Sequence, residues 1–327
     1  MVLPVPRRAL LGAVLVAPAL RPSSAAAQSF PDRPIRLIVP FPPGGPVDLS
    51  ARIVAQALSE ELKSSVVVEN RSGAGGVVGT DAVAKAPPDG YTLGFSSTGA
   101  VAVNPTLMPN NPYDSRRDFA PVSIVAGVPT LLCVNPKVPA RSVAELVTLA
   151  RARPGRFNFG SSGPGGTPHL SGERFKLNTG VNITHVPYRG AAPAITALLG
   201  DEVEMAFLDL PVLLPHVQEG RLRALAVTSP QRSSALPDVP TFAQAGVNGM
   251  EIENWYAILA PASTPPERVA RLHAATAAAM ARPVTSGQFT SQGARIILSR
   301  PDEALSFIRD EVDRWGEVVR AANVKAD

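Results

Sequence analysis

The sequence predicts an α/β protein with two lobes, and three observations support this expectation. From residue 35 onward, short runs of β-branched residues alternate with segments of helical periodicity, which is typical of βαβ units. The runs are continuously apolar, as expected for strands that helices cover on both faces. The chain has 327 residues, more than one hydrophobic core usually organises, and no low-complexity linker divides it.

Residues 1–27 are expected to form a cleaved secretory signal peptide. Arg7 and Arg8 precede an uncharged apolar run over residues 9–20, and an Ala-x-Ala site ends at Ala27. The paired arginines also fit a twin-arginine signal, so the general secretory route and the twin-arginine route both stay open. We therefore expect a periplasmic protein.

Composition excludes several classes of function. The signal segment holds three of the 31 lysines and arginines, so the mature chain would keep 28 basic residues against 27 acidic ones, without a basic stripe for nucleic acid. Cys133 is the only cysteine, which excludes an internal disulfide and a cysteine-based metal site. Two uncharged stretches, residues 91–113 and 119–136, are interrupted by Pro, Asn, Ser and Gly, so neither is expected to span a membrane.

The strands and helices follow from local pattern. Predicted strands cover, in chain order, residues 35–40, 65–69, 92–96, 130–134, 157–160, 185–188, 203–208, 222–228 and 255–260. An apolar stripe predicts a helix over 47–62, and the last helix is expected to open at Pro301 with acidic residues in its first turn. Ser142-x-x-Glu145 and Thr264-x-x-Glu267 are predicted to cap two further helices.

The order of these elements suggests a discontinuous first lobe. We expect residues 28–126 and 224–327 to form one lobe and residues 127–223 to form the other. A pair of strands crossing between two lobes makes a hinge, which suits closure around a ligand.

Loops at the ends of five predicted strands share one chemistry. They are Phe41 to Asp48, Ser96 to Gly99, Ser161 to Pro168, Tyr188 to Gly190, and Asp209 to Pro211. Ligands of open α/β sheets bind beyond the carboxyl ends of strands, where these loops would gather. Glycine permits close backbone approach, and amides in the first turn of a helix attract anions, so the loops suit a carboxylate. Asp48 and Asp209 could each complement a helix dipole or bind an ammonium group, and Phe41 and Tyr188 could supply apolar walls.

At these loops the sequence resembles the substrate-binding proteins of tripartite tricarboxylate transporters, also called the Bug family. The resemblance runs from about Pro31 to the C-terminus, and its motifs include Pro43-Gly44-Gly45-x-x-Asp48, Asp89-Gly90-Tyr91-Thr92-Leu93, Ser161-Ser162-Gly163-x-Gly165, His185-Val186-Pro187-Tyr188-x-Gly190 and Leu222-Arg223-Ala224-Leu225-Ala226-Val227-Thr228. It implies a type II periplasmic-binding-protein fold and a monomeric receptor that delivers its ligand to one large and one small membrane subunit. By position it implies ligand contacts from Phe41, Pro42, Gly44, Gly45, Asp48, Ser96, Ser97, Ser161, Ser162, Thr167, Tyr188 and Asp209.

We therefore expect a receptor for a dicarboxylate, a tricarboxylate, an amino acid or an aromatic acid, with no catalytic residue, metal or cofactor. Two alternatives stay open: an exported hydrolase that uses the serine-rich loop 161–167, and a periplasmic sensor for the same ligands. The hydrolase would need a base, for which His169 is the candidate, but Gly160-Ser161-Ser162-Gly163-Pro164 lacks the Gly-x-Ser-x-Gly spacing.

Overall fold

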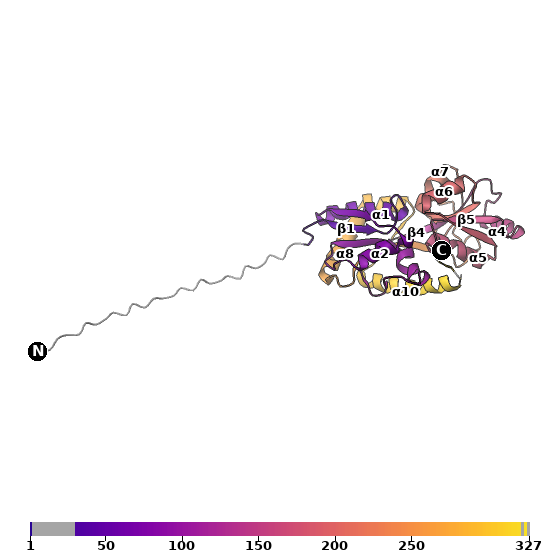
Figure 1. The fold of residues 1–327 in the computed structure, drawn as a ribbon. Coiled ribbons are helices and arrows are strands. Elements are labelled where there is room, and N and C mark those ends of the chain that lie inside the picture. Colours follow the sequence, from indigo (N-terminus) through magenta and orange to yellow (C-terminus); the bar gives the residue numbers. More distant parts are fainter. Residues whose placement is uncertain (2–29, 322–323, 326–327) are drawn as a thin grey trace.

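The computed structural model describes Met1, residues 30–321 and residues 324–325. The predicted signal peptide therefore lies outside the described residues, except for Met1. Within the described part the α/β class is confirmed: helices flank a sheet of strand order β2-β1-β3-β9-β4-β7-β5-β6, with β8 and β10 also paired to β4. Figure 1 shows the helices α1, α2, α8 and α10 around one half, and α4 to α7 around the other.

The first half contains a short parallel sheet. Its strands are β1 (Ile35–Val39), β2 (Val66–Asn70) and β3 (Thr92–Ser97), with β1 in the centre. Apolar residues of α1 (Pro46–Leu62) and α8 (Pro266–Ala281) cover one face. Apolar residues of α2 (Val77–Ala84), of the π-helical segment η2 (Gly99–Val103) and of α10 (Pro301–Ala321) cover the other. The same half holds η1 (Ala74–Gly76), α3 (Asn104–Leu107), α9 (Pro283–Ser291) and β10 (Arg295–Ile296).

The second half repeats this plan around a second parallel sheet. Strand β5 (Phe157–Ser161) lies between β6 (Ile183–Pro187) and β7 (Met205–Asp209). Helices α4 (Val143–Ala152) and α5 (Thr167–Thr179) contribute to the core on one face, and α6 (Ala191–Leu199) and α7 (Leu210–Gln218) to the core on the other. Strand β8 (Arg223–Val227) completes this half.

The strands β4 (Phe119–Val134) and β9 (Glu253–Pro261) join the halves. Over Phe119 to Pro129 β4 pairs antiparallel with β9, and over Thr130 to Val134 it pairs antiparallel with β7 and β8. The sheets are thus parallel on the outside and antiparallel in the middle, because a chain that crosses between the halves and returns runs in opposite directions. The lobe boundaries predicted at residues 126/127 and 223/224 fall inside β4 and at the start of β8, and they stay a proposal.

Strand β4 is much longer than the segment predicted, residues 130–134. Pro121, Gly127 and Pro129 locally disfavour a strand there, because proline cannot donate to a ladder and glycine weakens it. The structure accommodates the start of the run with register shifts between Pro121 and Ser123 and between Ile124 and Ala126.

Two of the helix signals have different outcomes. The cap at α4 is confirmed, since Ser142 Oγ accepts a hydrogen bond from the amide of Glu145 at 3.2 Å. The cap at Thr264 is wrong: α8 begins at Pro266, and the Thr264 hydroxyl donates to the carbonyl of Pro261 at 2.7 Å. Two consecutive prolines move the helix start beyond the reach of this hydroxyl.

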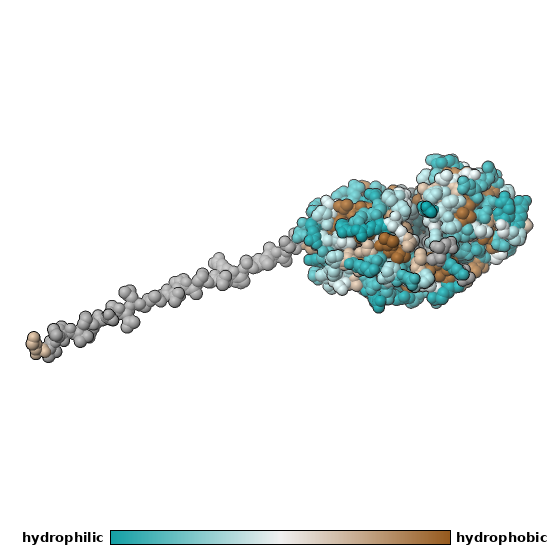
Figure 2. All heavy atoms as spheres, viewed as in Figure 1, coloured by the Kyte–Doolittle hydropathy of each residue, from teal (hydrophilic) through white to brown (hydrophobic). Residues whose placement is uncertain are grey.

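The remaining exclusions concern the described residues. Within them no helix is long and apolar enough to cross a membrane. No group of three or more His, Cys, Asp or Glu side chains within the same residues could hold a metal ion. Cys133 is fully buried in β4, and burial raises the pKa of its thiol. Figure 2 shows a largely hydrophilic outer surface on the face in view, with separate brown patches.

Candidate ligand-binding site

The loop between β1 and α1 is held in shape by Asp48. Its carboxylate accepts hydrogen bonds from the amide of Gly44 at 2.9 Å and the side chain of Asn70 at 2.8 Å. It also accepts a bond from Arg52 at 3.0 Å. Burial opposes ionisation of Asp48, but these bonds and the charge of Arg52 lower the pKa of the carboxyl below its ordinary value. Asp48 therefore organises the loop, and its oxygens are occupied by protein donors.

We expect Asp48→Ala to lower the free energy of unfolding by about 1–3 kcal/mol, because the donors of Gly44 and Asn70 lose their acceptor. The fold favours the ionised carboxylate, so this contribution is present at neutral pH and is lost as the pH falls below about 4. Urea unfolding at pH 7 would measure it. Asp302→Ala is the control, since Asp302 is an exposed acid in the first turn of α10 and its loss should hardly move the midpoint. Equal effects of the two changes would contradict this role.

Helix α1 begins without a side-chain cap. Gly45 is its N-cap, Pro46 opens its first turn, and no side chain of the described residues accepts from its N-terminal amides. Helix α5 begins in the same way, with Gly166 as N-cap and Pro168 in the first turn. Uncapped amides need partners, and the helix dipole makes both ends favourable for an anion.

The serines at the end of β3 face opposite sides of the sheet, because consecutive strand residues alternate. Ser96 Oγ lies 3.4 Å from the hydroxyl of Thr80 in α2. Ser97 is paired with Tyr256 of β9, whose ring packs in the core on the α1 face. The structure thus places Ser97, rather than Ser96, on the face where α1 begins.

Two histidines shape the loop after β5. Ser161 Oγ lies 2.6 Å from His185 Nε2 and accepts from the amide of Gly163 at 3.2 Å. His169 Nδ1 accepts from the amide of Gly165 at 3.1 Å, and its ring stacks on His185 with centroids 3.8 Å apart. Burial, with the nearby charges of His169 and Lys176, lowers the pKa of His185 to about 3, so His185 is neutral at physiological pH. Sequence reasoning missed His185, which lies 24 residues after Ser161.

The loops of the two halves meet. A methyl group on Gly165 would lie 2.1 Å from Leu107 Cδ2, and one on Gly99 would lie 3.5 Å from the Cα atom of Gly166. Within the first half, a methyl group on Gly76 would lie 3.1 Å from the ring of Phe41. Within the second half, one on Gly160 would lie 3.4 Å from the ring of Tyr188. The halves are therefore in a closed arrangement, with the loops at β1, β3 and β5 near one another.

Asp209 ends β7 and is 4% exposed. Its Oδ2 accepts from the side-chain amide of Asn254 in β9 at 2.8 Å, a contact between the two halves. Burial raises the pKa of Asp209 to about 7, although Asn254 and the hydroxyl of Tyr256 act in the opposite direction. Asp209 is thus the predicted site residue whose ionisation the fold opposes most.

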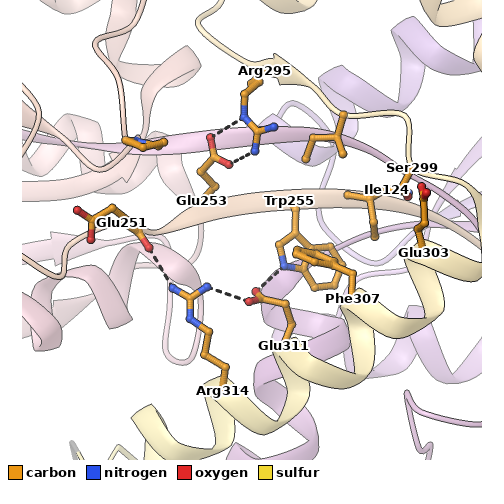
Figure 3. A pocket seen from close by; sticks show the side chains of 12 residues that line it. Ile124, Glu251, Glu253, Trp255, Arg295, Ser299, Glu303, Phe307, Glu311 and Arg314 are labelled. Carbon is orange, nitrogen blue, oxygen red and sulfur yellow. Dashed lines mark hydrogen bonds and ion pairs between the residues drawn. The ribbon is translucent and has the colours of Figure 1, made fainter.

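A prominent pocket lies elsewhere and contains none of the predicted site residues. It has a volume of about 400 Å³ and is lined by β9, β10 and α10 (Figure 3). Both of its arginines already pair with glutamates of the pocket: Arg295 with Glu253, and Arg314 with Glu311. Trp255 of this pocket follows Asn254 along β9, so the two side chains lie on opposite faces. We therefore do not assign the ligand to this pocket.

The arrangement at Ser161 does not fit a hydrolase. Ser161 is fully buried, and its Oγ is engaged by Gly163 and His185. His169, the candidate base, contacts the amide of Gly165 instead. A nucleophile must reach its substrate, and this hydroxyl is sealed from it.

Comparison with known proteins places these features in a family. Residues 50–324 match the model described as tripartite tricarboxylate transporter family receptor. Protein BugT of Bordetella pertussis is 42% identical over 301 residues, which cover 92% of this chain and 92% of that protein. The structure of R. palustris Rpa4515 with adipate is 38% identical, has a TM-score of 0.86, and covers 90% of this chain and 99% of its own.

A second solved structure is MatC (Rpa3494) from Rhodopseudomonas palustris with bound malate. It is 30% identical, has a TM-score of 0.82, and covers 89% of this chain and 100% of its own. The fold expected from the sequence, that of a periplasmic binding protein, is confirmed by these likenesses.

Proposed function

The chain belongs to the tripartite tricarboxylate transporter receptor family, and from this membership we propose that it captures a small carboxylate between its two halves. The family consists of receptors, so the protein is a binding protein and not an enzyme. The observation that carries the ligand class is the pair of glycine-capped helix starts, at α1 and α5, with amides that no side chain of the described residues caps. Relatives support the same class, since Rpa4515 holds adipate and MatC holds malate.

The proposed site combines elements of both halves. Backbone amides of the first turns of α1 and α5 would hold a carboxylate, and the hydroxyls of Ser97 and Thr167 would orient it. Phe41 and Tyr188 would supply apolar contacts, and Asp209 would meet a polar group at the other end of the ligand. Ser161 and Asp48 would act indirectly by shaping the two glycine-rich loops.

We also propose a route of export and a transport partner for this protein. Export would use residues 1–27 as a signal peptide, and the mature monomer would deliver its ligand to a large and a small membrane subunit. The high sequence pI of 9.5 partly reflects the arginines of that segment.

The test is a thermal melting screen of residues 28–327 against amino acids, aliphatic di- and tricarboxylates and aromatic acids. A ligand at 100 times its dissociation constant should stabilise the protein by about 2.7 kcal/mol, which is a visible shift of Tm. Mass spectrometry of the recovered ligand should find it unchanged. Conversion of the ligand to a product would overturn the receptor function. A Tm that no carboxylate shifts would overturn the ligand class.

A further inference from the structure

A group of buried side-chain oxygens without hydrogen-bond partners lies where the halves meet. Nine buried side-chain polar atoms lack a partner among the described residues, and five of them belong to residues of this region. Each of the five residues is at most 6% exposed. The atoms are Thr130 Oγ1, Thr167 Oγ1, Asp209 Oδ1, Asn254 Oδ1 and the hydroxyl oxygen of Tyr256. Buried polar atoms are normally paired, so five exceptions in one region need an explanation.

Four of these residues are neighbours on adjacent strands. Thr130 of β4 is the direct partner of Asp209 in the β4–β7 pairing. Asn254 donates to the other oxygen of Asp209, and Tyr256 lies two residues further along the same face of β9. The hydroxyl of Tyr256 is close enough to influence the pKa of Asp209, but it makes no hydrogen bond of ordinary geometry with Oδ1.

The same group lies on the sheet faces that the two helices of the proposed carboxylate site cover. Tyr256 is paired with Ser97 at the end of β3, on the face covered by α1. Phe207, two residues before Asp209, packs against Phe175 of α5 with ring centroids 5.7 Å apart. Asp209 therefore lies on the face of its sheet that α5 covers, and α5 begins at Thr167. A ligand whose carboxylate is held by the helix starts would reach Asp209 with its opposite or adjacent polar group.

These five unpaired atoms are all oxygens that can accept a hydrogen bond. Asp209 Oδ1 and Asn254 Oδ1 accept hydrogen bonds, and the hydroxyls of Thr130 and Tyr256 can do so as well. No lysine or arginine among the described residues forms an ion pair with Asp209 or contributes to its pKa. A buried carboxylate without a cation is costly, and a cation brought by the ligand would offset that cost.

We propose that Thr130, Asp209, Asn254 and Tyr256 form a subsite for a protonated amine, so that the ligand is an amino-substituted carboxylic acid. An ammonium group carries three N–H donors and one positive charge, which match the acceptors and the carboxylate. A hydroxyl group offers one donor and no charge. A second carboxylate would bring further acceptors to a region that already has too many. The proposal rests on the proposed function, because it assumes that the carboxylate is held at α1 and α5.

The experiment compares acids that differ only in the group expected at Asp209. Calorimetry at pH 8 would measure aspartate, malate and succinate, then 2-aminoadipate, 2-hydroxyadipate and adipate, and finally phenylalanine against 3-phenylpropionate. In the series whose length fits, we expect the amino acid to bind at least about tenfold more tightly than its hydroxy and unsubstituted analogues. Asp209→Asn should remove this preference, so that the amino acid loses at least about tenfold in affinity relative to its unsubstituted analogue.

Two further variants distinguish a loss of the amine subsite from a nonspecific loss of ligand binding. Thr130→Val removes an unpaired hydroxyl at similar volume and should weaken the amino acid more than its unsubstituted analogue. Asp201→Asn is the matched control, because Asp201 is an exposed acid of the second half that pairs with Lys137, away from the cluster. It should leave every affinity unchanged.

The outcomes are distinct. Equal affinities within each series, or an amino preference that survives Asp209→Asn, would overturn the subsite while leaving the carboxylate receptor intact. Tighter binding of the unsubstituted dicarboxylates would mean that Asp209 binds as the neutral acid, and would also overturn it. Failure of every acid to bind would overturn the receptor function and the subsite together. A folded variant is verified by its Tm, which is expected to rise for Asp209→Asn.

Discussion

Asp209→Asn is expected to raise the free energy of unfolding of the ligand-free protein by about 2 to 4 kcal/mol at pH 8. The reason is the burial of a carboxyl group that accepts from Asn254 and lies beside the hydroxyl of Tyr256, with no cation of the described residues paired to it. Asparagine fits the same space without a charge, and its amide group can donate to acceptors such as Asn254 Oδ1, which has no partner among the described residues.

The stabilisation by Asp209→Asn should depend on pH, because the charge of Asp209 is its cause. The folded state raises the pKa of Asp209 from 3.8 to about 7, so folding favours the protonated form. Below pH 4 the carboxyl is protonated in both states and costs nothing. The destabilisation grows as the pH rises from 4 and becomes constant above 7. The difference between the variant and the wild type should therefore be larger at pH 8 than at pH 5.

Urea unfolding at both pH values would measure this difference, with Asp201→Asn as the exposed control. A stabilisation of the same size at pH 5 and pH 8 would show that the charge of Asp209 is not its cause. A loss of stability would show that the carboxylate of Asp209 has stabilising partners beyond Asn254 and Tyr256.

Gly165→Val is expected to weaken ligand binding at least about a hundredfold, since misplacing the contacts of a closed site is costly. Gly165 has a φ of 72°, in the left-handed region, and lies at the contact between the halves. The first side-chain carbon would lie 2.1 Å from Leu107 Cδ2 of α3. The closed arrangement cannot form around this side chain without moving the loop that leads to α5.

Gly180→Val is the matched control, because Gly180 has a φ of 67° at the other end of α5 and a new side-chain carbon there meets nothing within 4 Å. Both variants carry the same backbone strain, and only Gly165→Val should lose affinity. Shortening Leu107 to alanine in the Gly165→Val background should restore part of the binding. Equal affinity losses in the two valine variants would attribute the effect to strain and not to closure.

Much of the architecture could be predicted from local pattern. The stripe over residues 47–62, the cap at Ser142 and the start at Pro301 each depend on residues within one or two turns, and α1, α4 and α10 agree with them. The glycine-rich loops before α1 and α5 were found in the same way. The length of β4 was missed, because tertiary pairing with β7, β8 and β9 outweighs the local preferences of its prolines.

The polar residues inside strands could not be predicted, because they have no turn signals around them. Thr130 and Tyr256 lie in apolar runs and Asn254 directly precedes one, and only the strand pairing brings them to Asp209. His185 belongs to a predicted strand and to a family motif, but only the pairing of β5 with β6 places it beside Ser161. Sequence reasoning thus located the glycine-rich loops with Asp48 and Ser161, and missed the strand residues that surround Asp209 and the histidine beside Ser161.

The isolation of Cys133 makes the protein suitable as a fluorescent sensor. Its thiol is buried in β4 and resists ionisation, and a thiol must ionise to react with a dye. A cysteine introduced at an exposed position beside the contact of the halves would therefore be labelled selectively, without first removing the native one. The emission of such a dye would report the opening and closing of the two halves as ligand is added.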